Sequence, residues 1–377
     1  MRRDTRFRPL PVVAILSAIL VAGCGSDTIA GLEDGFDAGV AATIVEAAAT
    51  AEWANLATGH AGMMVLAIKN TRPVEVSSVP TLDDDRFAGV GSRSAPSLGP
   101  RLSRVASTPA FSTTGRNGSL PDEALGKTYR IGEGAGAAGG YKIDEERTGA
   151  PADGARFVMY VLNEITGRPQ LIPISRAGQV DLTEPVPNAG LRLYATDKSD
   201  DVLADLQVER VVVEDATGRA TTLTSSGTLV KSNVYDYTLR DHVAFSNDLA
   251  NVEFEFERDV RSDARDLHVA MDSYGQISYT ETGATGTVTL SMLIESGGHS
   301  VGIDIVDDGV FANGSVTYDG QTVVLISGDN VDPTFQHPDG TLLEGHALDE
   351  MWELWFSYDY MLAFGDELIL PLSTLML

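Results

Sequence analysis

The second half of the chain alternates between apolar and polar residues with a period of two. Val252, Phe254 and Phe256 alternate with glutamates, and this pattern predicts a strand with one buried and one solvent-facing side. The same period recurs in residues 235–239, 288–294 and 301–305. Residues 157–165 and 211–213 instead carry apolar residues on both faces, which favours central strands that are covered on both sides.

Short turn sequences separate these predicted strands. They include Thr217-Gly218, Ser273-Tyr274-Gly275 and Asp319-Gly320, all rich in residues that favour turns. No helical pattern long enough for a crossover stands between the strands, so neighbouring strands are expected to be antiparallel. We therefore predict a mainly β domain over residues 127–377, an antiparallel sheet that forms a sandwich or a curved half-barrel. Whether residues 127–260 and 261–377 form one sheet system or two subdomains stays open.

Two segments have helical periodicity. Residues 28–68 place apolar side chains every three or four positions on an alanine-rich background, which predicts an N-terminal helix. Near the end of the chain, Leu348, Met351, Trp352 and Trp355 share one helical face. They predict a helix over residues 346–364 whose aromatic side packs on the sheet. Between these regions, residues 71–126 are rich in Pro, Ser and Gly without periodicity, which is typical of a flexible linker.

The N-terminus has the order of a secretory signal peptide, with several arginines followed by a short apolar run and small residues. The run ends in Val21-Ala22-Gly23-Cys24, which resembles the lipobox of bacterial lipoproteins. The resemblance implies that residues 1–23 are removed and that Cys24 receives a diacylglycerol group. Segment 24–70 is then the lipidated N-terminus and its helix.

An acyl anchor of this kind holds a protein on a membrane almost permanently. The resemblance therefore implies a bacterial cell-envelope protein attached to the membrane through Cys24. Gly25 follows the cysteine, and within the family this position favours the outer membrane. We expect the protein to face the periplasm or the cell surface.

Charge and cysteine content narrow the possible chemistry. The net charge is −27, and residues 1–23 hold four Arg and one Asp, a charge of +3, so their removal takes the net charge to −30. Such a chain repels phosphate backbones, and we expect no nucleic-acid partner. The single Cys excludes a disulfide framework, and the six His are scattered, so we expect no metal and no cofactor.

One motif resembles a catalytic element. Gly298-His299-Ser300-Val301-Gly302 matches the G-x-S-x-G nucleophile elbow. Candidate partners of Ser300 lie downstream at Asp304, Asp307, Asp329, His337 and His346. An elbow requires a helix after the serine, whereas the alternation here predicts a strand after a hairpin turn at residues 296–299. We therefore expect no catalytic residue, and a serine hydrolase that uses Ser300 is kept only as an alternative.

A glycine-rich stretch at residues 134–139 also matches G-x-G-x-x-G. Because no helix pattern follows it, a hinge is expected there rather than a nucleotide site.

The favoured interpretation is a non-enzymatic envelope lipoprotein with a binding or structural role, whose partner is an envelope protein or another molecule. A carrier of lipids or other apolar ligands is the alternative. It rests on an architecture similar to the LolA and LolB lipoprotein carriers, in which a curved sheet and helices enclose an apolar ligand. The carrier predicts an apolar cavity beneath Trp352 and Trp355.

Overall fold

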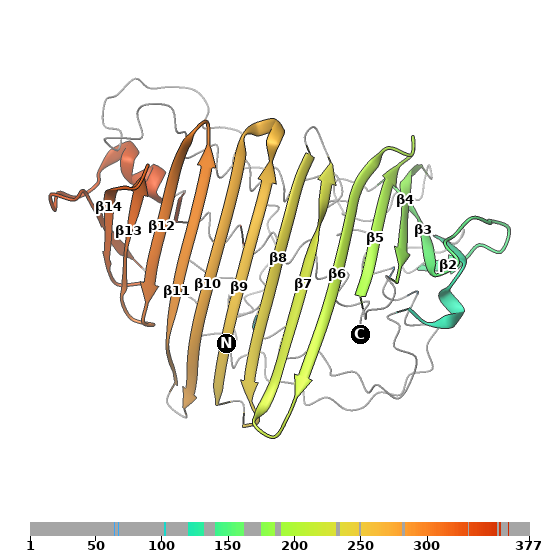
Figure 1. The fold of residues 1–377 in the computed structure, drawn as a ribbon, viewed down its shortest axis with the longest axis horizontal. Helices are drawn as coiled ribbons and strands as arrows, with labels where there is room; N and C mark the ends of the chain where they lie inside the picture. Colours follow the sequence, from blue (N-terminus) through green and yellow to red (C-terminus); the bar gives the residue numbers. More distant parts are fainter. Residues whose placement is uncertain are drawn as a thin grey trace, which may run out of the picture.

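The computed structural model describes most of the region after residue 119. The described residues are 120–131, 140–161, 175–184, 190–230, 234–248, 250–280, 283–330, 332–352, 354 and 355, with the single residues 64, 67, 102 and 361. Fifteen strands cross this region and join in one sheet (Figure 1).

The strands run β1 (Lys127–Ile131), β2 (Tyr141–Ile143), β3 (Gly154–Tyr160), β4 (Arg176–Thr183), β5 (Gly190–Asp197), β6 (Val202–Glu214), β7 (Gly218–Val230), β8 (Val234–Ser246), β9 (Asn251–Ser262), β10 (Leu267–Thr280), β11 (Gly283–Ser296), β12 (His299–Asp307), β13 (Ala312–Tyr318), β14 (Gln321–Gly328) and β15 (Pro333–Gln336). Two short 3-10 helices, η4 (Asp122–Ala124) and η5 (Asp263–Arg265), precede β1 and β10.

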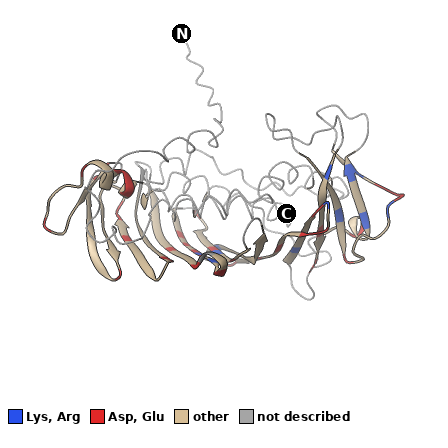
Figure 2. Cartoon of the chain, turned by 90° about the horizontal axis from the view of Figure 1, so that it is seen from above, with Lys and Arg blue, Asp and Glu red and all other residues tan. Residues whose placement is uncertain are grey.

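The strands follow one another through the sheet in chain order from β15 back to β3, and β1 and β2 complete the other edge. All pairs are antiparallel except β1 with β3, which is parallel. The predicted antiparallel, mainly β fold is therefore confirmed. Strands β9 and β10 pair along most of their length, so the regions before and after residue 260 share one sheet. The described strands form a single curved layer (Figure 2) rather than a sandwich of two layers.

The two faces of this sheet differ in chemistry. In β9, Val252, Phe254 and Phe256 are buried, whereas Glu253 between them is exposed. The same alternation runs through β8 and β12. We call the buried, apolar side the inner face and the opposite, polar side the outer face. Burial of the inner face supplies the main driving force for folding, because buried apolar area contributes about 25 cal/mol per Å².

Two predicted hairpin turns are confirmed. Ser296 pairs with His299, and Gly297 and Gly298 between them have φ values of 62° and 81°. Tyr318 pairs with Gln321 around Asp319 and Gly320, whose φ values are 46° and 78°. Positive φ at both central residues is typical of the tight turn whose twist matches the flanking strands.

The predicted turn at Ser273-Tyr274-Gly275 is wrong, because these residues lie in the middle of β10. Gly275 stands opposite Phe254 of β9, and a Cβ at this glycine would lie 2.3 Å from the Cζ of that phenylalanine. The glycine therefore makes room for a cross-strand aromatic ring. From the local sequence alone, a glycine here indicates a turn. The reason for the glycine is the ring of Phe254, which belongs to another strand and is therefore not visible in the local sequence.

A second correction concerns Val211 and Val213, which we expected to be covered on both faces. They lie near the end of β6, and each is 56% exposed. The nearby part of the outer face carries small side chains such as Ala220 and Ala244, which pair across β7 and β8. The described residues thus leave these two valines open to solvent.

A helix begins at residue 345, and its described residues are 345–352, 354, 355 and 361. Trp355 is buried, and Phe335 of β15 lies 5.0 Å from Trp352 and 5.7 Å from Trp355 between ring centroids, in edge-to-face geometry. The aromatic side of this helix thus packs on the sheet as predicted. No helix in the described part of the chain is both long and apolar enough to cross a bilayer.

Several predictions fall on other parts of the chain. Within the expected N-terminal helix at 28–68, only Met64 and Ala67 are described, and both are helical and buried. Within the expected flexible linker at 71–126, Leu102 is helical and buried, and residues 120–126 include η4 with the buried Leu120 and Ala124, so the linker prediction is wrong at these described positions. Cys24 and the glycine-rich stretch at 134–139 lie outside the described residues.

The packing of Gly275 against Phe254 generates a prediction. Gly275→Ala should lower the free energy of unfolding by about 1–3 kcal/mol, since the added methyl group overpacks the site. In a Phe254→Leu background the same substitution should cost roughly half as much or less, because the two residues are in contact. Urea denaturation of the four proteins of this cycle measures both values. An equal cost in the two backgrounds would show that the ring does not restrict this position.

Candidate functional site

The outer face aligns polar side chains in a row that crosses eight strands from β6 to β13. Each residue of the row is the cross-strand partner of the next. We call these residues the central row: Glu209, Thr224, Arg240, Glu257, Asp272, Ser291, Asp304 and Ser315. Because neighbouring strands lie about 4.8 Å apart, the row extends over about 34 Å.

Two depressions follow the central row. The first has a volume of about 570 Å³ and reaches from Gln207 on β6 to Asp272 on β10. The second, of about 400 Å³, reaches from Glu255 on β9 to Ser315 on β13. Asp272 lines both depressions, so they are consecutive parts of one shallow surface, which we call the outer groove.

The outer groove is acidic, with a guanidinium near its centre. Arg240 donates hydrogen bonds from Nη1 to Glu255 at 2.6 Å and to Glu257 at 2.7 Å, and these bonds raise the pKa of Arg240. Partial burial, followed by the charges of Glu257, Glu255 and Asp259, raises the pKa of Asp272. Burial is the largest cause of this shift and the neighbouring carboxylates add to it, so a cation beside Asp272 would favour its ionised form.

Beside the groove, His268 of β10 bridges the two neighbouring strands. Its Nε2 lies 2.9 Å from Oδ2 of Asp259 on β9, and its Nδ1 lies 2.7 Å from Oε2 of Glu295 on β11. Arg261 also donates to Asp259 at 2.8 Å. Partial burial lowers the pKa of His268, but the hydrogen bonds to Glu295 and Asp259 outweigh this effect and raise the pKa above its usual value.

The inner face also holds charges, although its surroundings are apolar. Nη1 of Arg258 lies 2.6 Å from Oδ1 of Asp241, and the two side chains are 0% and 2% exposed. Ser225 and Tyr237 form a hydrogen bond of 3.0 Å nearby, and burial raises the pKa of that tyrosine. Burial, and to a smaller extent the charge of Arg219, lowers the pKa of Arg210 to about 10.

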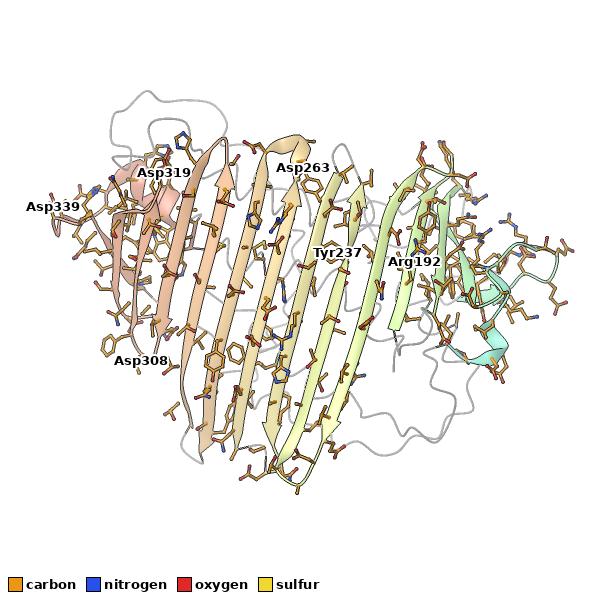
Figure 3. All side chains as sticks on the ribbon, in the orientation of Figure 1. Arg192, Tyr237, Asp263, Asp308, Asp319 and Asp339 are labelled. Carbon is orange, nitrogen blue, oxygen red and sulfur yellow. The ribbon has the colours of Figure 1, made fainter. Side chains whose placement is uncertain are left out.

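Ser300 lies in β12, at the strand start predicted from the sequence. Its backbone N–H donates to Asp319 at 2.8 Å. Nδ1 of His299 lies 2.9 Å from the same carboxylate, and the imidazole stacks on Tyr318 at 5.4 Å. Asp319 occupies the turn at the end of β13 (Figure 3). Because a strand follows Ser300, the elbow that a serine nucleophile requires is not formed.

The downstream partners that we considered for Ser300 do not converge on it in the described contacts. Asp304 accepts a hydrogen bond from Ser291 at 2.7 Å, and Asp307 accepts one from Asn330 at 3.1 Å. His346 lies 3.2 Å from Glu350 within the C-terminal helix. The carboxylate that does reach Ser300 was predicted only as a turn residue. The meander brings it there, since Asp319 N–H also donates to the Ser300 carbonyl at 2.8 Å.

Within the described residues, no group of three or more His, Cys, Asp and Glu side chains is arranged to hold a metal ion. Comparison with protein-family models, curated proteins and solved structures finds no match for this chain. The outer groove is therefore interpreted from its own residues. Sequence reasoning missed it, because the row depends on register across eight strands, although the alternating Glu residues of β9 marked part of it.

The bridge of His268 generates a prediction about pH. Because the pKa is raised in the folded protein, protonated His268 stabilises the fold fully below its unfolded pKa of about 6.5, and this contribution is lost as the pH rises through the folded pKa. His268→Gln should therefore cost about 0.5 kcal/mol near pH 5.5 and less near pH 9, a small effect because solvent screens exposed pairs. Urea denaturation at the two pH values measures the difference. A cost that does not change with pH would contradict the charged bridge.

Proposed function

We propose that this protein is a lipid-anchored component of the bacterial cell envelope that binds a partner on the outer face of its sheet and has no enzymatic role. The outer groove is the observation that supports this proposal. It is an extended polar surface on a sheet, and side chains on strands are positioned more precisely than side chains on loops. Its side chains hold one another through pairs such as Arg240 with Glu257, which limits the cost of ordering them on binding.

The anchor is the other part of the proposal. Cys24 would carry the lipid, and the segment up to residue 70 would include the alanine-rich helix, packed on the sheet like the C-terminal helix. The buried, helical Met64 and Ala67 support this arrangement. Segment 71–126 would connect this helix to the sheet, and the helical, buried Leu102 supports a point of packing within it. An outer-membrane location would place the outer face in the periplasm or at the cell surface, in reach of an envelope protein or polymer.

A carrier of lipids or other apolar ligands is the second candidate. A carrier needs an apolar cavity, whereas the depressions described above lie on the polar face. Beneath the C-terminal helix, Phe335 packs against both tryptophans, and Met351 and Leu354 are buried. This packing favours a filled interface over a ligand cavity. A hydrolase that uses Ser300 has less support than the carrier, because that serine lies in a strand.

Lipidation of Cys24 gives the first test. Cells that express the wild-type protein should incorporate radiolabelled palmitate into it, whereas Cys24→Ala should incorporate none, because this is the single cysteine of the chain. The variant should also leave the membrane fraction, since acyl chains provide the anchor. Equal labelling of the two proteins would refute the anchor.

Native mass spectrometry distinguishes the proposed binding protein from the alternative, a carrier of apolar ligands. The Cys24→Ala protein purified from cells should give the mass of the polypeptide alone, and organic extraction should yield no lipid in stoichiometric amount. We expect no bound lipid because Phe335 packs directly against Trp352 and Trp355. A stoichiometric apolar ligand would instead support the carrier.

A further inference from the structure

We infer that the outer groove binds a linear glycan that carries amino groups, with the glycan chain lying across the strands. This inference rests on the proposed function and specifies the ligand class of the same face. It depends on three properties of the groove, which are its length, its lining and its charge.

The length of the groove indicates a polymer. Two joined depressions with volumes of about 570 and 400 Å³ follow a row that repeats at each strand, about every 4.8 Å. A compact small molecule would be enclosed in a deeper pocket. A linear chain with a repeating unit can instead meet a similar set of side chains on each successive strand.

The lining favours a glycan over a protein segment. The row holds three hydroxyl groups, those of Thr224, Ser291 and Ser315, among its carboxylates. Hydroxyl and carboxylate groups together can donate to and accept from sugar hydroxyls. Tyr274 is 40% exposed in the second depression, where its ring offers a flat surface to the C–H face of a sugar. An extended peptide would pair with a strand edge. A folded protein would need a cluster of large apolar anchors, whereas the large apolar side chains exposed in the described groove are Tyr274 and Val306.

The charge of the groove selects the kind of glycan. Glu257 and Asp272 are cross-strand neighbours in the row, and Asp272 has a raised pKa partly because of the glutamates beside it. Phosphate, sulfate or carboxylate groups on a polymer would add to this repulsion. Ammonium groups would relieve it and form charge-assisted hydrogen bonds with the carboxylates.

Calorimetry on the detergent-solubilised full-length protein tests the inference with three probes. These are a β-linked glucosamine hexamer, the same hexamer fully N-acetylated, and hexalysine. The glucosamine hexamer should bind, and acetylation should weaken binding by about tenfold or more, since it removes the ammonium groups. Hexalysine should bind more weakly than the glucosamine hexamer, because it lacks sugar hydroxyls and ring faces.

Variants of the groove give the matched control. Glu257→Gln with Asp272→Asn should weaken binding of the glucosamine hexamer by about tenfold or more. Asp200→Asn with Asp201→Asn makes the same change in net charge in an exposed turn after β5, and should change the affinity by less than about twofold, as expected of charges far from the ligand. Urea midpoints verify that both proteins are folded. As a second groove variant, Tyr274→Ala should also weaken binding without altering charge.

Each contrary result has a distinct meaning. Hexalysine that binds as tightly as the sugar, and is lost with the same variants, would overturn the glycan in favour of a basic protein segment. If Asp200→Asn with Asp201→Asn lost as much affinity as the groove variant, the ligand would be attracted by the net charge of the protein and not by the groove. Failure of the glucosamine hexamer to bind, in a protein that palmitate labelling shows to be anchored, would refute this inference and leave the anchored role intact.

Discussion

The register of the long central strands is the constraint on which the other features depend. Strands β6 to β11 are 12 to 14 residues long, and a slip of one residue in any of them would exchange its inner and outer side chains. Phe254 and Phe256 would then face solvent, and glutamates would enter the core. Tight turns such as Gly297-Gly298, with both φ values positive, help to prevent such a slip, because their geometry accepts one pairing of the flanking strands.

The buried pair of Arg258 and Asp241 adds a second restraint on the same register. The two residues lie on neighbouring strands and are almost fully buried, so a slip of β8 against β9 would separate two charges inside an apolar layer. Breaking such a pair costs about 3–5 kcal/mol, although the pair itself adds little net stability. Its role is therefore to penalise alternative pairings. On the outer face, Arg240 and His268 offset the repulsion among carboxylates that correct register brings together.

Local patterns were sufficient for the fold class and insufficient for the groove. The alternation in β9 and the turn at Asp319-Gly320 predicted strands and hairpins correctly, because both signals depend on adjacent residues. Gly275 misled the prediction, since its function is to accommodate Phe254 of another strand. The central row was not predictable for the same reason. Asp272 and Glu257 become neighbours only through pairing of β9 with β10, and no short window of sequence contains that information.

The edges of the sheet bear on where binding takes place. An open sheet presents unpaired backbone groups at both edges, but here β2 has only three residues, and β15 is partly covered because Leu343 N–H donates to the Phe335 carbonyl at 3.0 Å. Edge pairing therefore offers little area in the described structure. The outer face is much larger, and its carboxylates disfavour contact with the same face of a second copy. The outer face repels a second copy of itself, and the sheet edges provide little area for pairing. The outer face is therefore suited to a ligand of opposite charge that lies across the strands.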